Sequence, residues 1–290
     1  MKILLRVVAM IACLTAWPAL AGELREGGKM LLTGGVSSVE GSAGGGLATW
    51  SLIAGNETNA GIGAKVHATY VALPEFDLAT GGVAVGFRDR VELSYARQVF
   101  DTRKAGATLG LGRGFKFSQD VYGLKVRLIG DAVYDQDRAL PQIAIGVQHK
   151  RANRGAIVTA IGGRHHAGTD FYVAATKVLL SQSLVLSGTV RFTKANQFGL
   201  LGFGGDRSDT YRPQVEGSAA VMLARNVVVG AEFRSKPSNL SFAREQNGAD
   251  LFAAWSVSRH VALTAAYADL GDIATVRKQR GLFLSVQGSI

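Results

Sequence analysis

The sequence has few cysteines and prolines, with one cysteine and five prolines among 290 residues. The single cysteine, Cys13, lies in an N-terminal apolar run, so the rest of the chain forms no disulfide and is not a small disulfide-stapled scaffold. Long apolar runs are also absent, because charged or strongly polar residues interrupt every later apolar stretch. This excludes a bundle of spanning helices, each of which needs about 20 predominantly apolar residues.

The N-terminus has the features of a secretory signal peptide. Lys2 and Arg6 accompany an apolar run from Ile3 to Ala16, and Ala19-Leu20-Ala21 forms a small-x-small cleavage site. We predict that residues 1–21 are a signal peptide and that the mature protein starts at Gly22. A membrane anchor is the alternative, but the apolar run is shorter than the roughly 20 residues that a spanning helix needs.

The charge balance is basic, with 32 lysines and arginines against 22 acidic residues. Removing Lys2 and Arg6 with the signal peptide leaves the mature chain near +8. Such an excess favours nucleic acid, an anionic membrane surface or acidic solutes as partners. Because the chain is exported, we expect no nucleic acid. The basic residues are spread along the chain, which fits a lumen or a rim facing lipopolysaccharide.

A two-residue alternation is the strongest structural signal, and the stretch from Asn226 to Lys236 shows it well. Successive side chains of a strand point to opposite faces. One face holds Val227, Val229, Ala231 and Phe233, and the other holds Val228, Gly230, Glu232, Arg234 and Lys236. The pattern recurs about a dozen times, and 37 glycines with few prolines suit closely paired strands. These features predict an all-β protein, an antiparallel transmembrane β-barrel.

The links between the predicted strands alternate in length from Ala60 onward. Seven longer links and six tight ones predict about fourteen strands, within a range of 12 to 16. Two of the predicted strands comprise residues 106–116 and 155–163. Outer-membrane barrels have an even strand number, short periplasmic turns and longer outer loops. A soluble sandwich or propeller is the alternative, but it gives no reason for links to sort by length. We therefore expect the Gram-negative outer membrane as the location.

The two ends of the mature chain differ from this pattern. Residues 22–58 are rich in glycine and form either a plug in the lumen or one further hairpin, from Met30 to Val36 and from Leu47 to Ala54. The barrel then comprises residues 59–290. The last strand, Gly281 to Ile290, resembles the terminal signal that barrel-insertion machinery recognises, although it ends in isoleucine and such strands usually end in an aromatic residue.

Several stretches resemble a family of proteobacterial proteins, the domain of unknown function 3034 family. The matching pieces are Leu31 to Trp50, Arg90 to Thr102, Gly123 to Asp137, Leu140 to Lys150, Glu232 to Phe242, Leu270 to Ala274 and Gln279 to Gln287. Together they span nearly the whole mature chain. The resemblance implies an outer-membrane barrel of unassigned role, and it implies no catalytic residues.

The alternation assigns a set of charged and polar side chains to the inner face. The predicted lumen-lining residues are Lys65, His67, Arg90, Glu92, Lys125, Arg127, Arg191, Glu216, Glu232, Arg234 and Lys236. A mostly basic ring in a pore selects anions. The alternative is a lumen filled by salt-bridged pairs that passes nothing.

From these residues we expect a monomeric channel or porin-like protein for small anionic or amphiphilic solutes. Its partners would be outer-membrane lipid, lipopolysaccharide and, through its last strand, the insertion machinery. A closed structural or envelope-interaction barrel is the first alternative. The second is an outer-membrane lipid-modifying enzyme, because an active site assembled across strands leaves no linear motif.

The sequence shows no strong metal, cofactor or catalytic motif. Asp131, Asp135 and Asp137 share one predicted outer loop, and Asp206 and Asp209 share another. Carboxylates at such spacing can hold calcium, but the full pattern of a calcium loop is missing and a solvated loop is the favoured interpretation. There is no G-x-S-x-G or H-E-x-x-H motif. We therefore predict no cofactor and no metal site.

Overall fold

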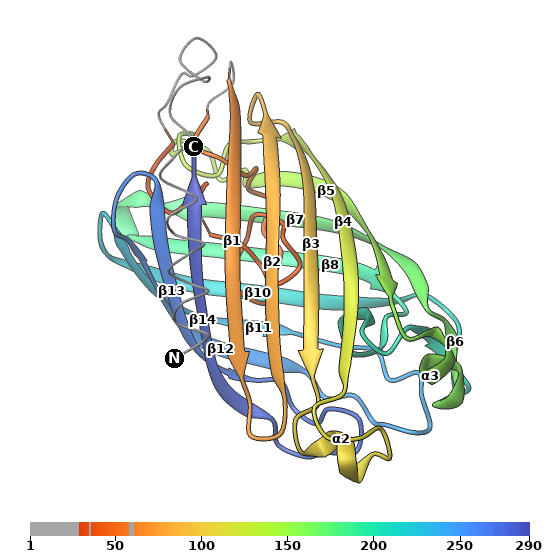
Figure 1. Cartoon of the computed structure of the whole chain (residues 1–290). Helices are drawn as coiled ribbons and strands as arrows, with labels where there is room; N and C mark the ends of the chain where they lie inside the picture. Colours follow the sequence, from red (N-terminus) through yellow and green to blue (C-terminus); the bar gives the residue numbers. More distant parts are fainter. Residues whose placement is uncertain (1–28, 35, 58–60) are drawn as a thin grey trace.

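The computed structural model describes residues 29–34, 36–57 and 61–290, and it forms a closed antiparallel β-barrel of twelve strands (Figure 1). The predicted signal peptide and its cleavage after Ala21 lie outside the described residues. No helix in the described part is long and apolar enough to cross a membrane.

The barrel strands pair in chain order. They are β1 (Ile62–Ala72), β2 (Asp77–Phe87), β3 (Val91–Asp101), β4 (Lys116–Ile129), β5 (Gln142–Ala152), β7 (Ala167–Leu179), β8 (Leu184–Thr193), β10 (Arg212–Ala224), β11 (Val227–Arg234), β12 (Gly248–Ser256), β13 (Val261–Asp269) and β14 (Arg280–Ser289). Strand β14 pairs with β1 and closes the barrel. Two short strands outside the wall, β6 (Gly163–His165) and β9 (Phe203–Gly205), pair with each other.

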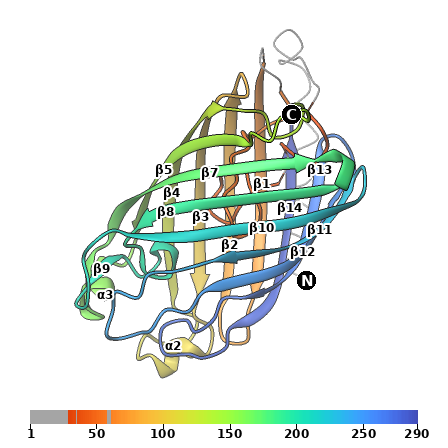
Figure 2. The ribbon, with the colours of Figure 1, turned by 180° about the vertical axis from the view of Figure 1, so that it is seen from behind.

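The links fall into two groups, one at each end of the barrel (Figure 1). The lower end in Figure 1, which we name the long-loop end, carries residues 73–76, 102–115, 153–166, 194–211, 235–247 and 270–279. The upper, short-turn end carries residues 88–90, 130–141, 180–183, 225–226, 257–260 and the C-terminus. Figure 2 shows the opposite side of the wall, where β7 to β12 run obliquely.

The predicted strand number was too high by two. Residues 106–116 were predicted as a strand, but α2 (Ala105–Thr108) and a loop occupy most of them. Gly110, Gly112 and Gly114 in this loop have positive φ, which an extended strand does not permit. Residues 155–163 were also predicted as a strand, but they form α3 (Gly155–Ala160) and the start of β6. The extra strand predicted at residues 106–116 reversed the predicted direction of the strands that follow it. The acidic loop around Asp131 was therefore predicted at the long-loop end, but residues 130–141 lie at the short-turn end.

The wall is apolar outside and polar inside, as the alternation predicts. Outward side chains such as Leu251, Leu223 and Leu284 are exposed, with 68% of Leu251 accessible. Inward side chains such as Lys125 and Arg191 are each only 1% accessible. This arrangement is the inverse of a water-soluble protein, and it suits a barrel whose outer surface contacts lipid.

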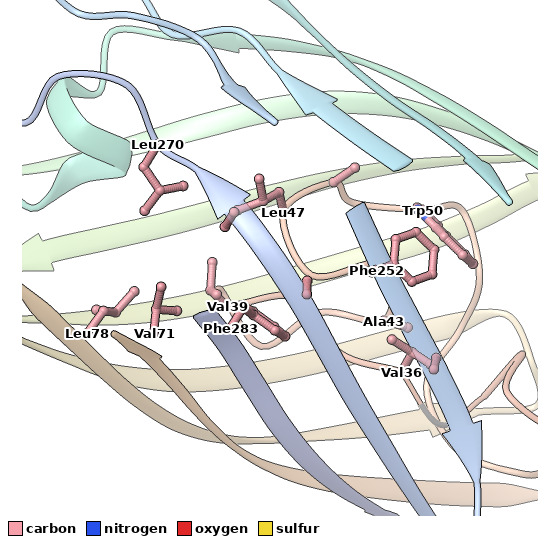
Figure 3. Packing of buried hydrophobic residues seen from close by; sticks show 14 of the residues in the cluster. Val36, Val39, Ala43, Leu47, Trp50, Val71, Leu78, Phe252, Leu270 and Phe283 are labelled. Carbon is pink, nitrogen blue, oxygen red and sulfur yellow. The ribbon is translucent and has the colours of Figure 1, made fainter. Parts of the chain in front are cut away.

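Residues 36–57 lie against the inner face of the wall. All of them except Asn56 are buried, and Figure 3 shows Val36, Val39, Ala43, Leu47 and Trp50 packed near wall side chains such as Phe252 and Phe283. We call the described residues 29–34 and 36–57 the N-terminal segment. It contains isolated bridges, Ser37 to Ala43 and Gly44 to Thr49, but no strand. The alternative hairpin is therefore not formed in the described part of this segment.

Candidate functional site

Glu40 of the N-terminal segment is fully buried among three cations of the barrel wall. Arg234 binds it in a bidentate manner, because Nη1 and Nη2 donate to the two carboxylate oxygens at 3.0 Å each. Lys150 Nζ lies 2.5 Å from Oε1, and Arg191 Nη2 lies 3.8 Å from Oε2. Charge-assisted and bidentate contacts of this kind are among the strongest hydrogen bonds in proteins.

Two carboxylates of the wall complete this group, which we name the Glu40 cluster. Asp170 lies 2.7 Å from Lys150, and Glu216 lies 2.5 Å from Arg191 and 3.3 Å from Arg234. The cluster therefore holds three cations and three carboxylates, one of which comes from the N-terminal segment. Burial alone would raise the pKa of Glu40, but Arg234, Lys150 and Arg191 outweigh it and hold the pKa well below its usual range.

Glu92 on β3 and Lys125 on β4 hold a second part of the N-terminal segment. Lys125 Nζ donates to the carbonyls of Ala43 and Leu52 at 2.9 and 2.7 Å. Glu92 accepts from the backbone N–H groups of Ala43 and Ala54 at 3.2 and 2.9 Å. The two side chains lie 3.3 Å apart and are both 1% exposed. One buried ion pair thus satisfies four backbone groups of the segment.

Strands β10 and β11 contribute a third set of contacts. Glu216 and Glu232 accept from the N–H groups of Thr49 and Leu47 at 2.7 and 2.8 Å. Trp50 Nε1 donates to Ser218 Oγ at 2.8 Å. These bonds join segments far apart in the chain, and they satisfy backbone groups that would otherwise be costly to bury.

The last described residue of the N-terminal segment, Glu57, lies near the short-turn end. Its nearest cation is Lys29 at 3.7 Å, and Lys29 also binds Asp89 at 2.7 Å. Neither carboxylate oxygen of Glu57 has a hydrogen-bond partner among the described residues. Burial raises the pKa of Glu57 to about 7, and the attraction of Lys29 only partly opposes this shift.

Raising the pH from about 5 to about 8 is expected to loosen the segment around Glu57. The folded protein holds the proton of the Glu57 carboxyl more tightly than the unfolded chain does. The contribution of this group to stability is therefore complete below pH 4.5 and is lost as the pH rises through about 7. Amide hydrogen exchange of residues 52–57, corrected for the intrinsic rate, measures this. Glu57→Gln should remove the pH dependence, and an equal dependence in both proteins would contradict the assignment.

The predicted lumen-lining residues occupy four locations. Lys65, His67, Glu92, Lys125, Arg191, Glu216, Glu232 and Arg234 are buried on the inner side of the wall. Arg127 lies at the short-turn end, 2.7 Å from Asp89. Lys236 follows the end of β11 and lies 3.5 Å from Glu245. Arg90 is different, because it is exposed in the turn between β2 and β3 and donates to the Leu128 carbonyl.

Sequence reasoning missed three members of the Glu40 cluster. Lys150 and Asp170 are both fully buried. Gln142 and Gln148 lie on the inner face of β5, and Lys150 is the next residue on that face. The two-residue alternation in the sequence could therefore have identified Lys150. Asp170 shares the inner face of β7 with Tyr172, but in the sequence from Thr169 to Leu180 both faces carry polar and apolar residues. Glu40 lies outside any strand, and no periodic signal could identify it.

The acidic loops bind protein groups. Asp131 Oδ1 accepts from the N–H groups of Val133 and Tyr134, and Asp209 binds Lys194. Asp206 accepts from the backbone N–H of Ser241 at 2.9 Å. Among the described residues, no group of histidine, cysteine, aspartate and glutamate side chains is arranged to hold a metal ion.

The geometry can now be compared with known proteins. A family model described as a protein of unknown function, DUF3034, matches residues 33–287. The chain belongs to this family. The match confirms the resemblance found in the sequence. Comparison with curated proteins gives no match.

One of the similar solved structures supports the fold. The chain is similar to a NanC porin, with a TM-score of 0.51 at 10% identity, and the match covers 78% of this chain and 98% of the porin. A KdgM porin gives 0.48 at 7% identity, covering 78% and 99%. Outer membrane phospholipase A from Escherichia coli gives 0.42 at 9% identity, covering 78% and 92%. At such identities the NanC likeness shows a porin-like barrel fold and nothing of the solute.

Proposed function

We propose that this protein is an outer-membrane channel for small solutes and that its N-terminal segment is a plug. The observation that carries the proposal is the fully buried Glu40 carboxylate of the segment, bound by Lys150, Arg191 and Arg234 of the wall. The segment is held by apolar packing and also by these buried ion pairs. If the segment leaves, the wall cations need another partner, which water or an anionic solute can supply.

The same cluster suggests which solutes pass. When the segment leaves, Lys150, Arg191 and Arg234 face only Asp170 and Glu216, so three cations meet two carboxylates. In the plugged barrel, Glu40 occupies the place that an anionic group of a solute would take after the segment leaves. We therefore propose a modest preference for anions, to which Lys125, Arg127 and Lys236 contribute.

Deleting residues 22–57 is expected to turn a silent barrel into a conducting one. Single-channel recording in planar bilayers compares the mature protein, residues 22–290, with this deletion and with a control lacking only residues 22–28. We expect steady steps with a modest anion preference from the long deletion alone. Neutral substitution of Lys125, Arg127, Arg191, Arg234 and Lys236 in that variant should reduce the preference, which the reversal potential in a salt gradient measures.

Silence from both the mature protein and the long deletion, with insertion verified, would contradict a channel. It would favour a closed structural or envelope-interaction barrel. One observation favours this second function, since with the segment in place the three wall cations of the Glu40 cluster face three carboxylates and Lys125 faces Glu92.

A lipid-modifying enzyme is the third hypothesis, and one contact favours it. His149 Nδ1 lies 3.0 Å from the Thr169 hydroxyl, and His149 is exposed. A hydroxyl beside an imidazole is an arrangement used in nucleophilic catalysis. Release of labelled fatty acid from phospholipid or lipopolysaccharide distinguishes this hypothesis from the other two.

The proposed location and partners follow from the outer surface and the last strand. The exposed apolar side chains of the wall suit direct contact with outer-membrane lipid, and the net positive charge of the chain suits lipopolysaccharide. We propose that the barrel is a monomer and that Gly281 to Ile290, which includes most of the closing strand β14, is the signal for the insertion machinery.

A further inference from the structure

An apolar pocket of about 130 Å³ lies among the links of the long-loop end. All six links of this end contribute to it. Representative lining residues, one from each link, are Phe76, Leu109, Ile157, Phe198, Phe242 and Ile273. Phe242 is exposed, so the pocket reaches the surface of the protein.

Both polar side chains among the described residues that line the pocket are engaged in hydrogen bonds within the protein. They are Thr102 and Gln197. The Thr102 hydroxyl donates to the Phe115 carbonyl at 2.9 Å. Gln197 Nε2 donates to the Asp272 carbonyl, and its Oε1 accepts from Lys236. A ligand with polar groups would therefore lose its bonds to water without replacement, which disfavours sugars and ionic solutes here.

The size and lining of the pocket suit a single aromatic ring. An engineered apolar cavity of about 150 Å³ in another protein stays dry and binds benzene, and this pocket is of similar volume. Its walls include Phe76 and Phe100, which stack with centroids 5.0 Å apart, and Phe117. Aromatic side chains prefer offset or edge-to-face partners, so a small ring can be held on several sides.

Phe198 gives the pocket a fixed wall. Arg234 and Lys236 lie 4.4 and 5.2 Å from the centroid of its ring. Its carbonyl accepts from Lys150 and Gln119 at 3.3 and 3.2 Å. Phe198 also has a φ of 59°, which is unusual for a large side chain and persists only where its surroundings fix it. These contacts keep the ring in place and oppose collapse of the pocket.

We propose that this pocket is a binding site for small monocyclic aromatic molecules that lack hydrogen-bonding groups. The pocket adjoins the Glu40 cluster through Phe198, whose ring and carbonyl contact Arg234 and Lys150, and the proposal goes beyond the channel function. It holds whether the barrel conducts or not.

Fluorobenzene binding to the folded mature protein in detergent tests the proposal by ¹⁹F NMR. The variant Leu201→Trp places a large side chain in the pocket, since Leu201 lines it. The matched control is Leu251→Trp on the exposed outer face of β12. We expect saturable binding to the unchanged protein and to Leu251→Trp, and at least about tenfold weaker binding to Leu201→Trp, because an overpacked pocket excludes the ring.

Equal, non-saturable partition of fluorobenzene into all three samples and into empty micelles would overturn the proposal. Heat-modifiable migration in gels checks that each variant is folded. If Leu201→Trp does not fold, crystals of the unchanged protein soaked with bromobenzene decide the question. A bromine anomalous peak among Phe76, Phe100 and Phe198 supports the site, and a peak only on the outer wall overturns it.

Discussion

Glu40→Gln is expected to release the N-terminal segment from a barrel that stays folded. The substitution keeps the size of the side chain and removes the charge that Lys150, Arg191 and Arg234 share. Removing one partner of a buried ion pair costs about 3–5 kcal/mol, and here it leaves three buried cations with the two carboxylates of Asp170 and Glu216. This cost is a factor of about 10² to 10⁴ in the population of released segment. The barrel strands keep their own hydrogen bonds.

Cysteine labelling measures this release. Because Cys13 lies in the predicted signal peptide, Ser51→Cys gives the mature chain a single thiol. Ser51 is fully buried, so its labelling by a maleimide reports opening of the segment. The rate should rise by about two to four orders of magnitude in Glu40→Gln.

Asp269→Asn is the matched control for this experiment. It makes the same change from carboxylate to amide in the exposed Asp269–Arg280 pair. Exposed pairs contribute about 0–1 kcal/mol, so the labelling rate should change little. Equal labelling of Glu40→Gln and the unchanged protein would show that the Glu40 cluster does not hold the segment.

Lys125→Met is expected to have the second large effect. The substitution leaves the buried Glu92 carboxylate without its cation, which costs about 3–5 kcal/mol. It also leaves the carbonyls of Ala43 and Leu52 without their shared donor, at about 1–3 kcal/mol each. The segment should therefore detach, and the thiol at position 51 should react at least as fast as in Glu40→Gln.

A double-mutant cycle with Glu92→Gln separates the ion pair from the backbone contacts. The double variant should be less destabilised than the sum of the single variants, by about 0.5–3 kcal/mol. Arg97→Met is the control, because Arg97 on β3 pairs with Asp120 on β4 on the exposed side of the same two strands. Strict additivity in the cycle, or an equal effect of Arg97→Met, would contradict the role of this pair.

The alternation of side chains predicted the barrel, because each strand position has only two possible faces. Glu232 and Arg234 on β11 face inward, and Phe233 between them faces outward. The same rule failed for residues 106–116 and 155–163. Apolar loop residues such as Leu109, Leu111 and Ile157 must also pack somewhere, and their spacing resembles that of a strand.

The sequence by itself determined the alternation of strand faces, the even number of strands and, in the described part of the chain, the absence of spanning helices, since these depend on residues close in the chain. The tertiary structure alone decided the closure at twelve strands, the partners of Glu40 and the pocket at the long-loop end. Lys150, Arg191 and Arg234 come from β5, β8 and β11, and they meet Glu40 only because the wall curves round on itself. Contacts across a closed barrel depend on its register and circumference, which no local pattern specifies.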